Sequence, residues 1–270
     1  MRKSEVNISL IITTYNRKDA LELVLLSVKM QSLMPFEVIV ADDGSTSETA
    51  ELIKHYQTQF PVKLLHCWQE DKGFRVSHIR NKAFAVASGE YIIMVDGDVI
   101  LHRNFIRSHL EHLASNHFIQ GSRVLLSPEA TQKAIESKQI HFTPFSKGIK
   151  NRINAISNRL FSQLIQVFYK GEKTHKGVRS CNLSCWKSDL IKVNGFSEEF
   201  IGWGREDSEF VVRLLNSGIS RTNLKFGGVV YHLWHKENKT DDLLKKNDIL
   251  LERAIAEGRK VCEIGLNQYI

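Results

Sequence analysis

Two aspartates one residue apart, Asp96 and Asp98, directly follow the apolar run 91–95. A run of this kind, bounded by glycines, is typical of a buried strand in a parallel sheet. The two carboxylates are therefore predicted at the carboxyl end of a strand, the edge where open α/β sheets bind ligands. Carboxylate oxygens at that edge suit Mg²⁺ or Mn²⁺ carrying a diphosphate. A solvated turn rich in Asp and Gly is the alternative reading of this segment.

A second group of polar residues opens a helix that is predicted to run to Leu215. Asp207 shares a stripe with Phe210 at helical spacing, so it is predicted to face inward in the first turn. A carboxylate there can act as a general base, and the helix dipole should keep it ionised near neutral pH. Trp203 could stack on a sugar ring and Glu206 could hydrogen-bond the same sugar. The alternative is that these acids only complement the helix dipole.

Two histidines three residues apart, His232 and His235, lie at the exit of a predicted strand in the segment 229–238. They could add nitrogen ligands beside Asp98, a mixed ligand set that suits Mn²⁺ better than Ca²⁺. A purely structural role for both histidines is the alternative. The sequence leaves open which of the two would bind the metal.

Alternating strands and helices in the first half would position these residues. Strands are predicted at 8–14, 36–41, 62–67 and 91–95, and helices at 19–30, 47–57 and 76–87. This order predicts an α/β fold with a mostly parallel sheet flanked by helices, because crossovers between parallel strands are right-handed. The loops 13–17, 41–46 and 96–98 should then converge on one crevice. An α+β fold is the alternative.

The loops contain neither a Gly-x-x-x-x-Gly-Lys phosphate loop nor a Gly-x-Gly-x-x-Gly dinucleotide turn. Kinase-like nucleotide hydrolysis and hydride transfer therefore lose support. What the loops do contain, in order, resembles an inverting family 2 glycosyltransferase with the GT-A fold, over about residues 7 to 125. The resemblance is carried by Ile12-Thr13-Thr14-Tyr15-Asn16-Arg17, Val40-Ala41-Asp42-Asp43-Gly44-Ser45, Gly73-Phe74, Arg80-Asn81 and Asp96-Gly97-Asp98.

The resemblance implies roles for individual residues in binding a UDP-sugar and a divalent metal. By analogy, Asp42 or Asp43 would hydrogen-bond the uracil, because its imide N–H needs an acceptor. Asp96 would approach the ribose and Asp98 the metal, since a diphosphate leaving group needs a cation. The remaining nucleotide contacts would be Thr13 and Tyr15 in the uracil pocket, Asn16 beside them, and Arg80.

Residues 178 to 240 also resemble the carboxyl-terminal Gly-Trp-Gly-Gly-Glu-Asp motif of animal β-1,4-galactosyltransferases and bacterial chondroitin-type polymerases. This resemblance makes Asp207 the base, Glu206 and Trp203 the acceptor contacts, and a histidine at the strand exit a metal ligand. One position departs from the motif, because Arg205 replaces its second glycine. A bulky cation there should narrow or charge the acceptor pocket, which favours an acceptor other than that of the relatives, such as an anionic sugar.

The segment 127–176 has few strand signals and carries an apolar stripe at helical spacing. The helix could pack this stripe on the core with its basic residues solvated, or it could lie on an anionic bilayer. Either arrangement would suit a lid on the acceptor side. The stripe consists of Ile153, Ile156, Leu160, Leu164 and Phe168, with Lys147, Lys150, Arg152, Arg159 and Lys170 around it.

Composition limits the partners and the location. A formal net charge of +7 over 270 residues favours anionic partners such as a nucleotide or a phospholipid surface. The basic residues are scattered, so nucleic-acid binding is not expected. The apolar stretch 8–12 is too short for a signal peptide, and no run approaches the roughly 18 apolar residues of a membrane span. We expect a cytoplasmic protein, with peripheral contact with the inner membrane as an option.

Together these patterns predict a metal-dependent enzyme that moves a hexose or N-acetylhexosamine from a UDP-sugar to a glycan or glycolipid acceptor, using Mn²⁺ or Mg²⁺. Residues 1–126 would bind the nucleotide sugar and residues 127–270 the acceptor, and bacterial lipopolysaccharide-core or capsule synthesis fits this activity. A sugar nucleotidyltransferase is disfavoured, because the loop 13–17 lacks glycines. A glycoside hydrolase is disfavoured because adjacent acids on a helix diverge. A non-catalytic glycan- or nucleotide-binding subunit stays open.

Overall fold

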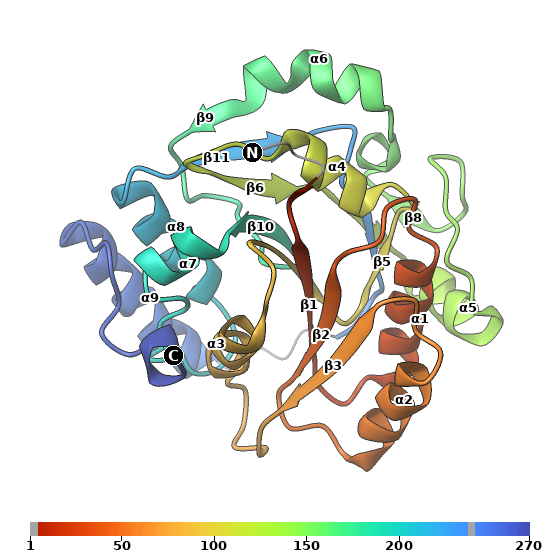
Figure 1. Ribbon diagram of the computed structural model, residues 1–270, viewed down its shortest axis with the longest axis horizontal. Coiled ribbons are helices and arrows are strands. Elements are labelled where there is room, and N and C mark those ends of the chain that lie inside the picture. The colour runs from red at the N-terminus through yellow and green to blue at the C-terminus, as the bar shows by residue number, and fades with distance from the viewer. Residues whose placement is uncertain (1–4, 237–240) are drawn as a thin grey trace.

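The four apolar runs of the first half form adjacent strands at the centre of the molecule (Figure 1). The computed structural model describes residues 5–236 and 241–270. The strands of the main sheet are β1 (Ile8–Thr14), β2 (Glu37–Asp42), β3 (Lys63–Trp68), β4 (Tyr91–Asp96), β6 (His117–Gly121), β9 (Lys170–Glu172), β10 (Asn182–Trp186) and β11 (Ser220–Leu224). Their order in the described residues is β3-β2-β1-β4-β10-β6-β11-β9.

The pairing of these strands changes at β4. From β3 to β4 all pairs are parallel, as predicted for the first half. Strand β10 runs antiparallel to both β4 and β6, and β11 is parallel to β6, so the sheet is mixed beyond β4. The carboxyl ends of β4, β6 and β11 therefore lie at one edge of the sheet, together with the beginning of β10.

Helices cover both faces of the sheet, because successive strand side chains point to opposite faces. Leu10 and Ile12 pack on one face with α1 (Lys18–Lys29) and α2 (Ser47–Gln57). Ile11 packs on the other face with α3 (Val76–Val86) and α8 (Glu206–Asn216). The strands are thus buried on both sides, which explains their continuous apolar runs.

A smaller sheet carries the histidine segment. Its strands are β5 (Val99–Leu101), β7 (Arg123–Leu126), β8 (Ile149–Lys150) and β12 (Val230–His232), in the order β5-β12-β7-β8. Strand β5 follows the Asp96-Gly97-Asp98 turn directly, and His232 pairs with Val99 across the antiparallel β5–β12 ladder. This pairing brings His232 next to a turn more than a hundred residues earlier in the chain.

Helices α4 (Phe105–His112), α5 (Pro128–Ser137) and α7 (Lys187–Lys192) were not predicted from the sequence. Only Thr131 and Ala134 of α5 are buried, so its apolar pattern is too sparse to recognise. The remaining helices are α6 (Arg159–Tyr169), α9 (Asp241–Ala256) and the 3₁₀ turns η2 (Arg152–Ala155) and η3 (Leu266–Gln268). In the part of the chain that the structure describes, no helix is long and apolar enough to cross a membrane.

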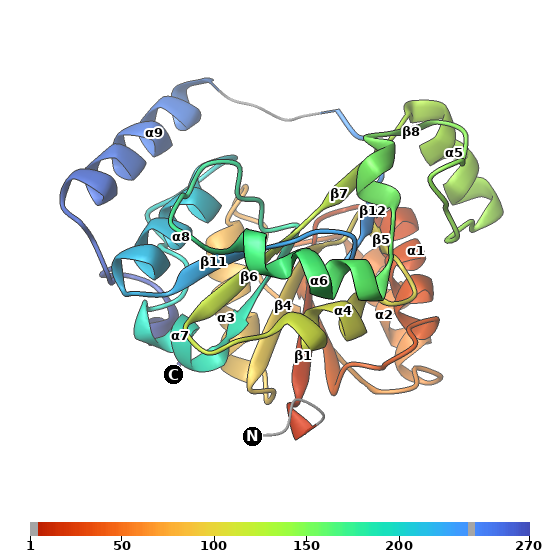
Figure 2. The same ribbon diagram turned by 90° about the horizontal axis from the view of Figure 1, so that it is seen from above.

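Helix α6 does not pack its apolar stripe on the core, so that expectation is wrong. The side chains of Leu164 and Phe168 are 74% and 83% exposed, and α6 lies across the outside of the molecule (Figure 2). Its inner side is small and polar: the Ser162 hydroxyl donates to the Lys225 carbonyl at 2.6 Å. The helix is also held by the Phe161 ring, whose centroid lies 4.6 Å from that of Phe226, and by the Asn158 N–H, which donates to the Phe226 carbonyl at 2.9 Å. Leu164 and Phe168 point outward.

Candidate active site

The three loops predicted to converge do meet at one edge of the sheet. Thr13 at the end of β1 pairs with Ala41 of β2 on one side and with Asp96 of β4 on the other. The Gly97 N–H donates to the Thr13 carbonyl at 2.6 Å, and the Asp43 N–H donates to the Thr14 carbonyl at 3.0 Å. Backbone hydrogen bonds thus join the loops that follow β1, β2 and β4.

Asp42 supports the loop after β2 and has no exposed surface. One of its oxygens accepts the Ser45 N–H at 2.8 Å, and the other accepts His66 Nε2 at 2.9 Å. A fully buried carboxylate with both oxygens bonded cannot touch a ligand without rearrangement. Of the two residues predicted as alternative uracil contacts, Asp42 is the one with no exposed surface, and in the structure it shapes the loop.

Asp43 is also engaged within the protein. Its carboxylate accepts hydrogen bonds from Gln69 Nε2 at 2.5 Å and from the Arg75 N–H at 2.9 Å. Burial raises the pKa of Asp43, while these hydrogen bonds oppose the shift. Asp43 thus ties the loop after β2 to the start of α3, next to the predicted nucleotide contacts.

Tyr15 is exposed, with 47% of its surface accessible, and so is its neighbour Asn16. Its hydroxyl donates to Asp71 Oδ2 at 2.8 Å, and this hydrogen bond is the main reason that the pKa of Tyr15 is raised. Asn16 has a left-handed backbone (φ 47°), and its side-chain oxygen accepts the Thr46 N–H at 2.9 Å. Asn16 therefore joins the loops after β1 and β2, and the ring of Tyr15 faces solvent beside them.

Arg80 of α3 lies between the two groups of acids and is almost fully buried. Its guanidinium donates to Thr13 Oγ1 at 3.3 Å, to Asp96 Oδ1 at 3.3 Å and to Glu206 Oε1 at 3.5 Å. It also lies over the Phe196 ring, 5.1 Å from the centroid. Arg80 thus links the Asp96-Gly97-Asp98 turn to the beginning of α8, a link that no sequence pattern indicated.

Asp98 and the two histidines form one cluster, with ligand atoms all within 4.8 Å of one another. The Nε2 atoms of His232 and His235 lie 3.7 Å and 3.4 Å from the Asp98 carboxylate. Each Nδ1 donates to a backbone carbonyl, that of Leu233 or that of Lys236, so each Nε2 keeps its lone pair in the neutral ring. Residues 237 and 238, the last of the predicted histidine segment, lie outside the described residues.

The donor set of this cluster fits a divalent metal. Asp98 Oδ1 is buried and has no hydrogen-bond partner among the described residues, although it faces His232. The Leu233 N–H donates to the Asp98 carbonyl at 2.9 Å and fixes the strand exit against the turn. One carboxylate oxygen and two imidazole nitrogens match the ligands that Mn²⁺ accepts in proteins.

Arg17 lies beside the cluster and pairs with Asp98, a contact that the sequence did not reveal. Its Nη1 donates to Asp98 Oδ2 at 3.1 Å. Arg17 was part of the recognised motif, but its partner lies 81 residues further along the chain. Spacing cannot predict such a pair.

The base candidate Asp207 lies in the first turn of α8. The Ser180 N–H and the Ser208 N–H donate to its carboxylate, and so does the Ser208 hydroxyl at 3.3 Å. Burial raises the pKa of Asp207, with Arg80 opposing the shift. The helix dipole was expected to favour the ionised form of Asp207, and burial acts against it.

Glu206, the neighbour of Asp207, also has a raised pKa. Burial, followed by the charge of Asp207, raises the pKa of Glu206 to about 7, although Arg80 lowers it. Its Oε2 atom is buried and has no hydrogen-bond partner within residues 5–236 and 241–270. Glu206 and Asp207 are thus two adjacent carboxyl groups that titrate together nearer to neutral pH than ordinary acids.

A strained loop before α8 presents Trp203, which is 40% exposed. Arg205 has a left-handed backbone (φ 75°), a conformation that its counterpart glycine adopts at less cost. Its Nε donates to Asp248 of α9, so the cation is neutralised there rather than narrowing or charging the predicted acceptor pocket. Leu243 of α9 packs so closely on Gly202 that a Cβ at Gly202 would lie 2.7 Å from its Cδ1. Helix α9 thereby holds the Trp203 loop.

Sequence comparisons identify two matching families. The glycosyl transferase family 2 model matches residues 9–171, and a model described as the N-terminal domain of galactosyltransferase matches residues 164–236. The chain is 28% identical over 262 residues to the chondroitin synthase of Escherichia coli, covering 89% of this chain and 37% of that protein. It is 28% identical over 225 residues to the validoxylamine A glucosyltransferase of Streptomyces hygroscopicus subsp. limoneus, covering 80% and 49%. The chain thus spans half or less of these relatives.

Solved structures share the fold. Staphylococcus aureus TarS 1–349 in complex with UDP aligns with a TM-score of 0.61 and 17% identity, covering 97% of this chain and 68% of that chain. The mannosyltransferase PcManGT of Pyrobaculum calidifontis, in complex with GDP-Man and Mn²⁺, aligns with a TM-score of 0.60 and 15% identity, covering 94% and 73%. Because a family model matches more than half of its residues, the chain belongs to glycosyl transferase family 2, and it has the GT-A fold of these structures.

Proposed function

We propose that the chain is a metal-dependent, inverting glycosyltransferase that moves a hexose or N-acetylhexosamine from a UDP-sugar to a glycan acceptor. One observation carries the proposal: Arg80 joins the Asp96-Gly97-Asp98 turn to the carboxyl pair at the start of α8. Metal ligands and a base candidate thus lie on two sides of one buried cation. The proposal is supported by the UDP and the Mn²⁺ named for the solved glycosyltransferases of the same fold.

On the donor side, Thr13 and Tyr15 would line the uracil pocket with Asn16 beside them. Asp43 would hydrogen-bond the uracil, and Asp96 would approach the ribose. Tyr15 has the exposed ring that such a contact needs. A Mn²⁺ or Mg²⁺ ion held by Asp98, His232 and His235 would neutralise the charge on the departing diphosphate. Arg80 adds a fixed positive charge beside Asp96, within the protein rather than in solvent.

On the acceptor side, Asp207 would take the proton of the attacking hydroxyl. The hydroxyl oxygen forms a bond to the anomeric carbon as the bond to the diphosphate breaks on the opposite face, so one displacement inverts the configuration. A raised pKa makes the ionised Asp207 a stronger base than an ordinary aspartate. Trp203 would stack on the acceptor sugar, and Glu206, anchored by Arg80, would hydrogen-bond it.

A donor panel tests this function. The purified chain is incubated with UDP-sugars and UDP-N-acetylhexosamines, with and without Mn²⁺, and release of UDP is measured. We expect Mn²⁺-dependent release with one donor class and faster release when a glycan acceptor is added. Formation of UDP-sugar from UTP and a sugar 1-phosphate would instead indicate a nucleotidyltransferase. Nucleotide binding without turnover of any donor would indicate a non-catalytic subunit.

The proposal also assigns a role to each half of the chain and a biosynthetic context. Residues 1–126 would bind the nucleotide sugar and residues 127–270 the acceptor. Capsule or lipopolysaccharide-core synthesis in the bacterial cytoplasm is supported by the similarity to a bacterial chondroitin synthase. We expect no nucleic-acid partner, since the basic residues are scattered along the sequence.

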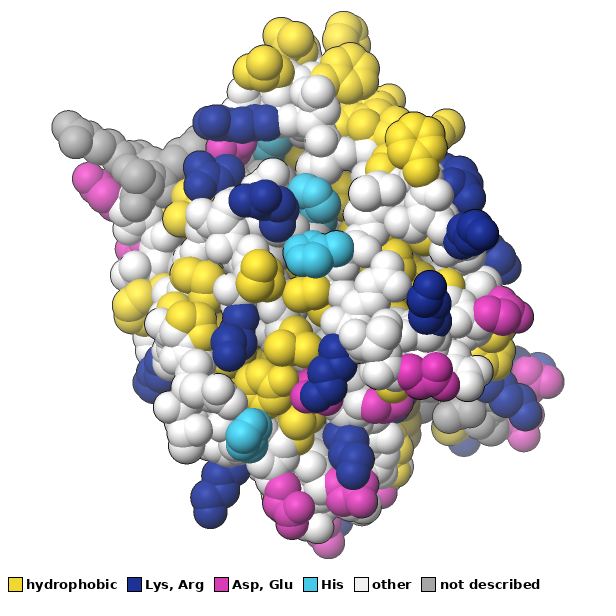
Figure 3. All heavy atoms as spheres, turned by 90° about the vertical axis from the view of Figure 1, so that its right-hand side faces the viewer, with side chains coloured by type: hydrophobic (Ala, Val, Ile, Leu, Met, Phe, Trp, Pro, Cys, Tyr) yellow, Lys and Arg dark blue, Asp and Glu magenta, His cyan; other side chains and the backbone are white. Residues whose placement is uncertain are grey.

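We further propose that α6 rests on an anionic membrane surface, where a glycolipid acceptor would lie. Figure 3 shows hydrophobic side chains gathered along the upper rim, where α6 lies in Figure 1. Leu160, Leu164 and Phe168 are each more than two-thirds exposed. Basic residues flank them at Arg152, Arg159 and Lys170, although Arg159 also pairs with Glu111. An apolar face bordered by cations matches the interface of an anionic bilayer.

Vesicle sedimentation tests this contact. The chain should bind vesicles of phosphatidylcholine and phosphatidylglycerol, and binding should weaken at high salt. Leu164→Gln combined with Phe168→Gln should reduce binding at least tenfold, whereas Ile249→Gln, at a 65% exposed position on α9, should not. Equal binding by both variants would contradict the assignment to α6.

A further inference from the structure

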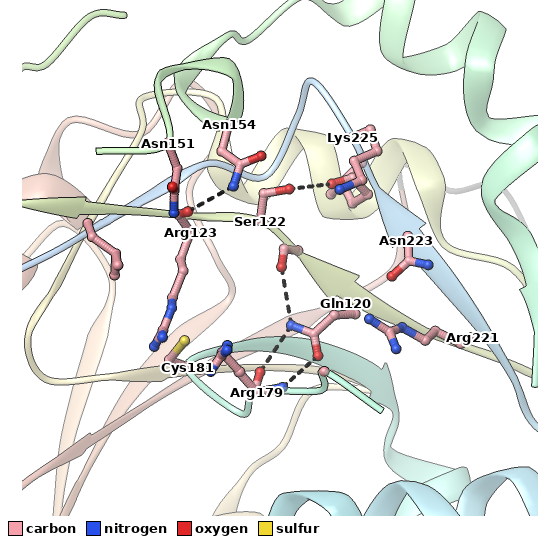
Figure 4. Close-up of a pocket in the computed structure, with 14 residues that line it drawn as sticks. Gln120, Ser122, Arg123, Asn151, Asn154, Arg179, Cys181, Arg221, Asn223 and Lys225 are labelled. Atoms are coloured by element: carbon pink, nitrogen blue, oxygen red, sulfur yellow. Dashed lines mark hydrogen bonds between the residues drawn. The ribbon is translucent and has the colours of Figure 1, made fainter. Parts of the chain in front are cut away.

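A cavity of about 320 Å³ opens at the same edge of the sheet, beside the residues described above. It lies where β6 and β11 end and β7 begins, and the segment 177–181 closes one side (Figure 4). Four cationic side chains line it, and none of its described lining residues is an Asp or a Glu. The cations are Arg123, Arg179, Arg221 and Lys225.

Arg221 is the buried cation of this pocket, with only 7% of its surface exposed. Its Nη1 donates to the Lys176 carbonyl at 2.8 Å, but its Nε has no hydrogen-bond partner in the described part of the chain. Glu172, on the neighbouring strand β9, forms a long ion pair with Arg221, with its Oε2 atom 3.9 Å from that Nε and beyond hydrogen-bond distance. A buried guanidinium with an unused donor favours an anion beside it.

The pocket lies next to both halves of the active site. Ser180, whose N–H donates to the base candidate Asp207, is flanked by Arg179 and Cys181, which line the pocket. On the other side, the lining residue Leu125 pairs with His232 across the β7–β12 ladder. The pocket is therefore linked to the base candidate through Ser180. It is linked to the proposed metal ligands through the pairing of Leu125 with His232.

The polar side chains of the lining suit a sugar that carries a negative charge. Figure 4 shows Arg123 running from β7 toward Cys181 and Arg179, and Arg221 reaching toward Gln120 from β11. Guanidinium groups bind carboxylate and phosphate oxygens in pairs, which gives directional recognition. The amides Asn151, Asn154 and Asn223 also line the cavity. Asn154 Nδ2 already donates to the Arg123 carbonyl and Asn223 Nδ2 to Glu172, so these two would offer a sugar hydroxyl chiefly their amide oxygens.

We propose that this pocket binds an anionic sugar unit of the acceptor glycan, through a carboxylate or a phosphate held by Arg123, Arg179 and Arg221. The inference rests on the proposed function and specifies the class of its acceptor. The acceptor is favoured over the donor because the segment 179–181 contacts the residue that takes the acceptor's proton. The pocket, rather than Arg205, then supplies the positive charge that selects an acidic acceptor.

A matched pair of glycosides tests the pocket. Methyl β-D-glucuronide and methyl β-D-glucoside differ only at C6, and their binding to the full chain is measured by saturation-transfer NMR with UDP and Mn²⁺ present. We expect the glucuronide to bind at least tenfold more tightly, a difference worth about 1.4 kcal/mol. Inorganic phosphate should displace it if a phosphate group can serve as the anion.

Variants that each remove one arginine charge test whether the glucuronide binds in this pocket. Arg123→Gln and Arg179→Gln should each weaken the glucuronide about tenfold and move the glucuronide-to-glucoside ratio toward one. Arg103→Gln removes the same charge at an exposed position outside the pocket and should leave the ratio unchanged. Arg221→Gln should have the largest effect, and because Arg221 is buried, thermal unfolding checks that this variant folds.

Three results would overturn the inference. One is equal binding of the two glycosides to the unaltered chain, and another is an unchanged ratio in the Arg123→Gln, Arg179→Gln double variant. The third is weaker binding of UDP-glucuronate but not of methyl glucuronide by that double variant, which would assign the anion to the donor. Calorimetric titration with UDP and Mn²⁺ tests the proposed function separately. A chain that binds UDP but does not distinguish the two glycosides contradicts only the proposal for the pocket.

Discussion

The loop after β2 and the turn after β4 each carry two aspartates, and they differ in how the protein uses them. All four carboxylate oxygens of Asp42 and Asp43 accept hydrogen bonds from neighbouring residues. In the turn, Asp98 Oδ1 is buried without such a partner in the described residues and faces two histidines. Both oxygens of each acid after β2 already support the loop, so a uracil contact by Asp43 would share an oxygen with Gln69 or Arg75. Asp98 after β4 instead keeps a buried oxygen without a protein partner in the described residues.

Helix α8 repeats this contrast within one turn. Both oxygens of Glu209 bind Arg213, at 2.7 Å and 2.8 Å, and both side chains are fully buried. Three residues earlier, Glu206 has one oxygen on Arg80 and the other without a partner among the described residues. We therefore expect Glu209 to matter for stability and the carboxyl pair before it to matter for chemistry.

The largest expected effect concerns Asp207. Replacement by Asn removes the base and should lower the transfer rate by about 10²–10⁴-fold, while nucleotide binding persists. Initial rates with the preferred UDP-sugar and calorimetry with UDP measure the two properties. Asp19→Asn, an exposed aspartate on α1, is the control. Transfer by Asp207→Asn at the rate of the unaltered chain would show that Asp207 is not the base.

The next effect tests the fully paired acid of α8. Glu209→Ala leaves Arg213 buried without its carboxylate and should lower the free energy of unfolding by about 3–5 kcal/mol. Urea unfolding followed by circular dichroism measures this loss. A change below about 1 kcal/mol would mean that the pair contributes no more than a surface ion pair.

A smaller loss is expected in the loop after β2. Asp42→Ala leaves the Ser45 N–H and His66 without their acceptor and should lower the free energy of unfolding by about 1–3 kcal/mol. The same measurement on Asp98→Ala should give a smaller loss, because one oxygen of Asp98 has no protein hydrogen bond to lose among the described residues. A larger loss for Asp98→Ala would reverse the contrast between the two loops.

The smallest expected effect is a pH dependence due to Glu206. Its pKa in the folded chain is about 7, above the ordinary value of 4.5, so the folded state holds more protons between these pH values. The unfolding free energy should therefore fall, by on the order of 1–3 kcal/mol, as pH rises from about 4.5 to 7. Urea unfolding at several pH values should show that Glu206→Gln lacks this part of the decline. An identical decline in the variant would show that Glu206 does not cause it.

The sequence predicted the first half of the fold well, because continuous apolar runs such as 91–95 indicate buried parallel strands. It also brought Asp98 and the histidines together, since both follow strands. It missed the partners of Arg17 and Arg80, which are distant in sequence and depend on how loops pack. The outward-facing stripe of α6 could not be predicted either, because periodicity fixes which residues share a face but not what that face contacts.

The cationic pocket was missed for a related reason. Its arginines come from β7, the segment 177–181 and β11, and no two of them form a motif. Arg205, which the sequence did single out, pairs instead with α9. The charge of the proposed acceptor pocket thus comes from residues that the strand order brings together, which a sequence pattern does not reveal.

The most direct test of the account is calorimetric titration of the chain with UDP, with and without Mn²⁺, repeated with Asp98→Ala. The cluster of Asp98, His232 and His235 predicts that UDP binding requires Mn²⁺ and that Asp98→Ala loses this dependence together with most of the affinity. Equal UDP binding with and without Mn²⁺, or unchanged binding by Asp98→Ala, would contradict the assignment of the turn after β4 as the ligand-binding pair of acids.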